Sequence, residues 1–117
     1  MTAQHTPGPW VFNDTHYTDS AVVTDSRGLE IANAYHMPIL LGYAEKLNIQ
    51  HWADKPGEAY IELEPAEQEA NARLIAAAPE LLRALREIAC SYPATEEGEV
   101  LAGIARDAVI KATGEKK

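Results

Sequence analysis

The C-terminal half of the fold is decided by the stretch Glu69-Ala-Asn-Ala-Arg-Leu-Ile-Ala-Ala-Ala-Pro-Glu-Leu-Leu82. Its apolar residues, and those that follow as far as Ala89, recur at spacings of three and four, which is the pattern of one amphipathic helical stripe. Pro79 interrupts this stripe, because proline lacks a backbone donor and disfavours the helical conformation of the preceding residue. We therefore predict either a kinked helix or two helices that meet at Pro79.

Helix signals lie on both sides of this stretch. Pro65 suits the first turn of a helix, and the acidic residues around it favour the positive end of the helix dipole. Farther along, Thr95 can cap a second helix, whose apolar stripe runs over Val100–Ala112 and whose stop signal is Gly114. The sequence thus predicts a helical region, about residues 65–113, of two C-terminal helices that pack antiparallel.

The N-terminal half reads as short strands joined by turns. The stretch Asp25-Ser-Arg-Gly28 supplies turn chemistry between two β-prone runs, and period-two alternation leaves one face of the sheet free to lie on a core. We predict a sheet region, about residues 8–63, with three or four antiparallel strands. The β-prone runs are Trp10–Phe12, Ser20–Thr24, Leu29–Tyr35 and Ala59–Leu63.

Residues 37–57 are read as a connection in which Pro38–Leu41 is a candidate strand and Tyr43–Asn48 a candidate helical turn. The expected fold is α+β: a small N-terminal antiparallel sheet followed by two C-terminal antiparallel helices. At 117 residues, the chain fits a single domain over residues 1–117, small enough for a second subunit to complete its burial.

Composition limits the classes of partner. The chain is 46% hydrophobic and 24% charged, as in folded globular proteins, and its formal net charge is −8. No apolar run approaches the roughly 20 residues that cross a bilayer, so we expect no membrane partner. The acidic charge repels a phosphate backbone, which disfavours duplex nucleic acid as a direct ligand. The lone Cys90 and an N-terminus without a secretory signal favour the cytoplasm.

Signatures of catalysis are missing from the sequence. The four histidines, His5, His16, His36 and His51, form no pair at metal-ligand spacing. There is no glycine-rich phosphate loop and no nucleophile elbow. We therefore expect a protein that is not an enzyme, with no catalytic residue, no metal and no cofactor.

Asn71 and Arg73 are the first candidates for ligand contact. Asparagine is a mediocre helix former that hydrogen-bonds well, and arginine recognises phosphate. The structural alternatives are that Asn71 ties the helix to the sheet and that Arg73 pairs with Glu69. Arg83 and Arg86 on the same helix are read as surface ion pairs. The aromatic and histidine candidates for an exposed ligand-binding face are Tyr35, His36 and Tyr43.

Three motifs carry a resemblance: Thr6-Pro-Gly-Pro-Trp10, Gly28-Leu-Glu-Ile-Ala32 and Ala70-Asn-Ala-Arg-Leu-Ile-Ala-Ala-Ala-Pro-Glu-Leu-Leu82. Together they resemble a group of small accessory proteins of phages and prophages, which implies a place in the bacterial host cytoplasm. The expected sheet followed by helices is also similar to the sponges that oppose Thoeris defence.

The similarity to those sponges implies a non-catalytic counter-defence protein that sequesters a cyclic nucleotide immune signal of the cyclic ADP-ribose type. The ligand would lie between protomers, with arginine on phosphate, an amide on the base or ribose, and aromatic rings for stacking. The implied assembly is a homo-oligomer formed through the helices.

Two alternatives stay open. An acidic surface can imitate nucleic acid, as in an inhibitor of a host defence complex such as an anti-CRISPR or a nuclease blocker. The other alternative is a phage accessory protein with no role in defence.

Overall fold

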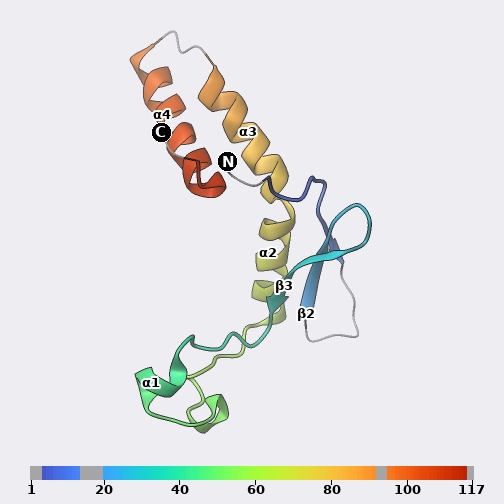
Figure 1. Ribbon diagram of the computed structural model, residues 1–117, viewed down its shortest axis with the longest axis vertical. Helices are drawn as coiled ribbons and strands as arrows, with labels where there is room; N and C mark the ends of the chain where they lie inside the picture. The colour runs from blue at the N-terminus through green and yellow to red at the C-terminus, as the bar shows by residue number, and fades with distance from the viewer. Residues whose placement is uncertain (1–3, 14–19, 92–94, 116–117) are drawn as a thin grey trace.

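The computed structural model describes residues 4–13, 20–91 and 95–115. Within these ranges the chain is α+β, with a three-stranded antiparallel sheet near the N-terminus and four α-helices (Figure 1). The molecule is elongated, with extents of 57 × 34 × 31 Å. The sheet and α2 form its middle, α3 and α4 form one end, and the segment that carries α1 forms the other (Figure 1).

The sheet has the strand order β1-β2-β3. Its strands are β1 (Val11–Asn13), β2 (Ser20–Thr24) and β3 (Glu30–Tyr35). The predicted hairpin is confirmed, because β2 pairs antiparallel with β3. Gly28, at the end of the connecting turn, has a φ of 88°, a left-handed value that glycine adopts without steric cost.

Asp25 organises this turn from a buried position. Its carboxylate accepts hydrogen bonds from the backbone N–H groups of Arg27 (2.9 Å) and Leu29 (3.0 Å), and it forms an ion pair with the Arg27 guanidinium (2.6 Å). Burial raises the pKa of the Asp25 carboxyl, but the bonds from Arg27 and Leu29 outweigh it, so the pKa lies below its ordinary value of 3.8. The ionised side chain therefore stabilises the turn.

The core lies between the sheet and α2 (Pro65–Ala76). Ala21 and Val23 of β2 and Ala34 of β3 are buried against Ala72 of α2. These small side chains let the helix approach the sheet closely. Gln68 ties the two layers together, because its Nε2 donates a hydrogen bond to the Ala34 carbonyl oxygen at 2.9 Å.

Pro79 divides the long helical stretch into two helices. α2 ends at Ala76 and α3 spans Ala78–Cys90, so Pro79 stands in the first turn of α3, where its missing N–H costs least. α4 spans Glu96–Thr113. Of the two predicted alternatives, the split at Pro79 is confirmed, so α2, α3 and α4 follow the sheet region rather than one kinked helix and α4. α3 and α4 pack against each other, and their antiparallel direction stays a prediction.

The limits of α4 follow the predicted signals. The Gly98 N–H donates to Thr95 Oγ1 at 3.1 Å, which caps the first turn. Gly114 ends the helix with a left-handed φ of 73°. In the described part of the chain, every helix is too short or too polar to cross a membrane.

The segment between β3 and α2 extends away from the sheet. It carries α1 (Tyr43–Leu47) and the 3-10 helix η1 (Trp52–Asp54), so the predicted helical turn is confirmed. The predicted strand at residues 59–63 is not one of the three strands. Tyr60 makes isolated bridges with Ile39 and Pro56. Backbone bonds also join this segment to residues 36–40, including Leu63 N–H to the His36 carbonyl oxygen at 2.7 Å. Flanking prolines, which lack an N–H, limit this ladder.

Candidate functional site

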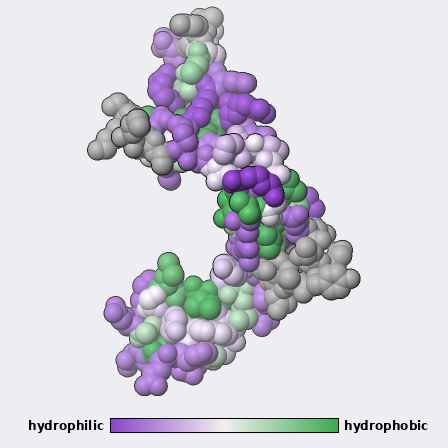
Figure 2. Space-filling view, turned by 45° about the vertical axis from the view of Figure 1, so that its right-hand side comes forward, coloured by the Kyte–Doolittle hydropathy of each residue, from purple (hydrophilic) through white to green (hydrophobic). Residues whose placement is uncertain are grey.

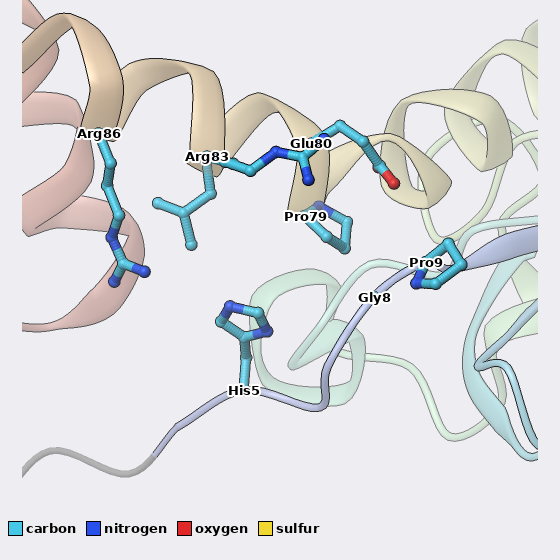
Figure 3. A pocket seen from close by; sticks show the side chains of 8 residues that line it. His5, Gly8, Pro9, Pro79, Glu80, Arg83 and Arg86 are labelled. Carbon is cyan, nitrogen blue, oxygen red and sulfur yellow. The ribbon is translucent and has the colours of Figure 1, made fainter.

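A cavity lined by positive charge lies where the N-terminal segment meets the start of α3. We call it the arginine cavity; its volume is about 510 Å³, within the range of small-molecule sites. Figure 3 shows Arg83 and Arg86 on one helix, with His5 across the space from them. The lining residues are His5, Gly8, Pro9, Pro79, Glu80, Leu82, Arg83 and Arg86.

The two arginines of this cavity differ in how they are engaged. Arg86 makes a long ion pair, 3.7 Å, with Glu115 at the end of the described chain. Within the described residues, the Arg83 side chain has neither a hydrogen bond nor an ion pair, which leaves its guanidinium donors for a ligand. The prediction that both form surface ion pairs is therefore wrong for Arg83. Glu80 is the one acidic residue that also lines the cavity.

His5 is positioned by its neighbours. Its Nδ1 lies 2.8 Å from the Thr6 carbonyl oxygen, which can only accept, so Nδ1 carries the proton and donates. The ring also packs edge-on against Trp10, with centroids 6.2 Å apart. The Trp10 indole N–H donates to the same carbonyl at 3.1 Å. These contacts leave Nε2 of His5 as the ring atom for interaction with a ligand.

Gly8 allows the N-terminal segment to lie directly on α3. A Cβ atom placed at Gly8 would be 2.8 Å from Cβ of Pro79, closer than such atoms approach in proteins. The Thr6–Trp10 motif and Pro79 thus form one packing unit. It brings the start of the chain to the arginines of α3.

Two of the predicted site residues meet at another cavity. Tyr35 at the end of β3 and Asn71 on α2 line a space of about 370 Å³, which we call the Tyr35 cavity. Most of its lining is apolar, and Tyr35 itself is 64% exposed. The other lining residues are Ala34, Pro38, Leu63, Leu74 and Ile75. Asn71 is exposed here. The helix-to-sheet hydrogen bond that the structural alternative assigned to Asn71 is made by Gln68 instead.

The remaining predicted residues lie elsewhere. Arg73 pairs with Glu69 at 2.7 Å, and its guanidinium sits 5.3 Å from the centre of the Phe12 ring, so the structural alternative describes its contacts. His36 is half-buried, and its backbone carbonyl accepts from Leu63. Tyr43 is the first residue of α1, in the segment between β3 and α2. None of these three lines either cavity, and their role in ligand binding stays a prediction.

Comparison with known proteins identifies the lineage. The family model described as Salmonella phage P22 protein Y8K6 matches residues 1–116. The chain belongs to this phage protein family. No curated protein and no solved structure matches it. Membership in the phage P22 Y8K6 family supports the predicted class of phage accessory protein, whereas the similarity to Thoeris sponges stays a prediction.

The arginine cavity of this Y8K6-family protein was only partly visible in the sequence. Arg83 and Arg86 stood out as a cluster in an acidic chain, but nothing in the pattern placed His5 near them. The sequence feature that bears on the position of His5 is the Thr6–Trp10 motif. Its glycine and prolines indicate a rigid segment, but they do not show which helix that segment contacts. Among the described residues, no group of three or more His, Cys, Asp or Glu side chains is arranged to hold a metal ion.

Proposed function

We propose that this phage protein is a non-catalytic counter-defence protein that binds and sequesters a small anionic ligand, a cyclic nucleotide immune signal of the cyclic ADP-ribose type. One observation carries the proposal: Arg83, whose side chain has no partner among the described residues, shares a cavity of about 510 Å³ with Arg86 and His5. Cationic donors that line an open space are what a phosphate group requires.

The charges explain how such a ligand is held in an acidic protein. The net charge of −8 repels anions at long range, but screening limits this repulsion to about 8 Å at physiological ionic strength. Inside the cavity, Arg83 offers a planar fork of donors for a phosphate group, while Arg86 adds a second positive charge. Binding without turnover fits a cavity whose lining residues include no Ser, Thr, Cys or Lys side chain.

The phage lineage supports the biological setting. A small phage accessory protein that acts in the host cytoplasm can lower the free concentration of a signal by binding it stoichiometrically. The Tyr35 cavity, with an exposed ring and the Asn71 amide, is a second place for the predicted contacts to a base or ribose. Its apolar lining lacks the positive charge that a phosphate needs.

Calorimetry tests the proposal with cyclic ADP-ribose, related cyclic nucleotides and inorganic phosphate as titrants. We expect saturable binding of a nucleotide, weakened about tenfold to a hundredfold by Arg83→Ala, because a charge-assisted bond contributes roughly 1.5–3 kcal/mol. Arg106→Ala is the matched control, since Arg106 is an exposed arginine of α4 outside the cavity. Binding that is equally strong in Arg83→Ala would contradict the assignment of the cavity.

A second candidate function is inhibition of a host defence complex through protein contact. The acidic first turn of α4, with Glu96, Glu97 and Glu99, favours such an inhibitor. The 84% exposure of Leu41, in the segment between β3 and α2, also favours contact with another protein. Figure 2 shows apolar surface on that end of the molecule. Salt-sensitive capture of a basic host protein, together with no binding of any cyclic nucleotide, would favour this candidate over sequestration.

A further inference from the structure

α4 carries two apolar faces, and the described chain covers only one of them. Ala102, Ala105 and Val109 are buried against α3. On the other side of the helix, Val100, Leu101 and Ile104 are 60–62% exposed. A surface helix of a monomer normally has one apolar stripe. The second stripe indicates a surface that is covered by another protein.

The chain as a whole buries less apolar surface than a compact domain of its length. For 117 residues a compact domain has a radius of gyration of about 13 Å, whereas the value here is 18.6 Å. Among the described residues the buried apolar side chains are six alanines and two valines. Small side chains contribute little to the free energy of folding, because the hydrophobic gain scales with the area buried. A partner chain would supply the missing burial.

We propose that this partner is a second copy of the chain, docked antiparallel along α4. The pattern of the exposed side is self-complementary about Ile104, which stands near the middle of the helix. When two copies meet there, Val100 faces Ala108 of the other copy, and Glu97 faces Lys111. The acidic first turn of each α4 then lies beside the basic last turn of the other, as the helix dipoles also favour.

α3 extends the same surface. Leu81 and Ile88, each nearly half exposed, lie on one flank of α3. With α3 and α4 antiparallel, as predicted, helical periodicity places that flank of α3 on the same side of the helix pair as Leu101 and Ile104 of α4. Two such helix pairs then pack as a four-helix bundle, which buries the exposed apolar side chains of α3 and α4 in one interface. Arg83 and Arg86 lie on the opposite flank, so the proposal does not depend on ligand binding.

The mass in solution tests this dimer. We expect the wild-type protein to have twice its chain mass of 12.8 kDa in sedimentation equilibrium, and Ile104→Glu to weaken dimerisation about tenfold or more, because it places two charges at the symmetry axis. Leu41→Glu is the matched control, since Leu41 is 84% exposed but lies outside α3 and α4. Circular dichroism would verify that each variant is folded.

A charge exchange identifies the partner and its direction. Glu97→Lys and Lys111→Glu should each weaken the dimer, because each places like charges across the interface. The double variant should restore dimerisation, which only an antiparallel second copy explains. A protein that is monomeric at high micromolar concentration, or a double variant weaker than both single variants, would overturn the proposal.

Discussion

A few side chains decide the local structure at the residue scale. Asp25 satisfies two backbone N–H groups and one guanidinium from a position that is 4% exposed, so the β2–β3 turn depends on one carboxylate. Arg83 is the opposite case, an arginine without a protein partner in the described chain. A charge that protein groups satisfy, as at Asp25, stabilises the fold. An arginine whose donors are unsatisfied at a cavity, as at Arg83, can bind a ligand.

Asp25→Asn tests the turn through pH. The folded pKa of Asp25 is lowered, so its contribution to stability is present above the ordinary value of 3.8 and is lost as pH falls through the folded pKa. The variant should melt at lower temperature than wild type at neutral pH, and the difference should shrink as pH falls below that value. Thermal unfolding followed by circular dichroism measures it. A difference that is constant from neutral to strongly acidic pH would contradict the role of the ionised carboxylate.

The elements of the fold were predictable where a periodic pattern or a turn signal was strong. The β2–β3 hairpin, the start of α2 at Pro65 and both ends of α4 follow from local chemistry. Residues 59–63 pair with residues 36–40 through a few backbone bonds but do not join the sheet, and a strand pattern alone does not show which segment becomes its partner. Likewise the arginine cavity depends on where the N-terminal segment docks, which is a tertiary contact between Gly8 and Pro79.

Gly8→Ala tests that docking of one element on another. The new methyl group would meet the rigid Pro79 ring, and overpacking of this kind costs about 1–3 kcal/mol. Gly103→Ala is the matched control, because a Cβ there meets no atom within 4 Å and alanine favours the helix by roughly 0.5–1 kcal/mol. Urea unfolding should show a less stable Gly8→Ala and a more stable Gly103→Ala. Equal effects of the two substitutions would refute the close contact.

At the scale of the whole molecule, the shape and the two functions proposed for its surfaces are connected. An elongated chain with an alanine-rich core exposes apolar faces that a second copy can cover, while the arginine cavity stays open on the other flank of α3. A dimer of this kind presents two cavities, which suits the proposed stoichiometric binding of a signal. This arrangement is consistent with the phage lineage, the charge pattern and an Arg83 side chain that has no partner among residues 4–13, 20–91 and 95–115.

The proposed function is sequestration of a cyclic nucleotide without its conversion. The direct measurement is mass spectrometry of the small molecules that stay with the protein when it is purified from cells producing such a signal, before and after heat denaturation. We expect an intact cyclic nucleotide to be released on heating from wild type and from Arg106→Ala, and to be lost from Arg83→Ala. Release of a hydrolysed product, or no nucleotide at all from wild type, would contradict the account.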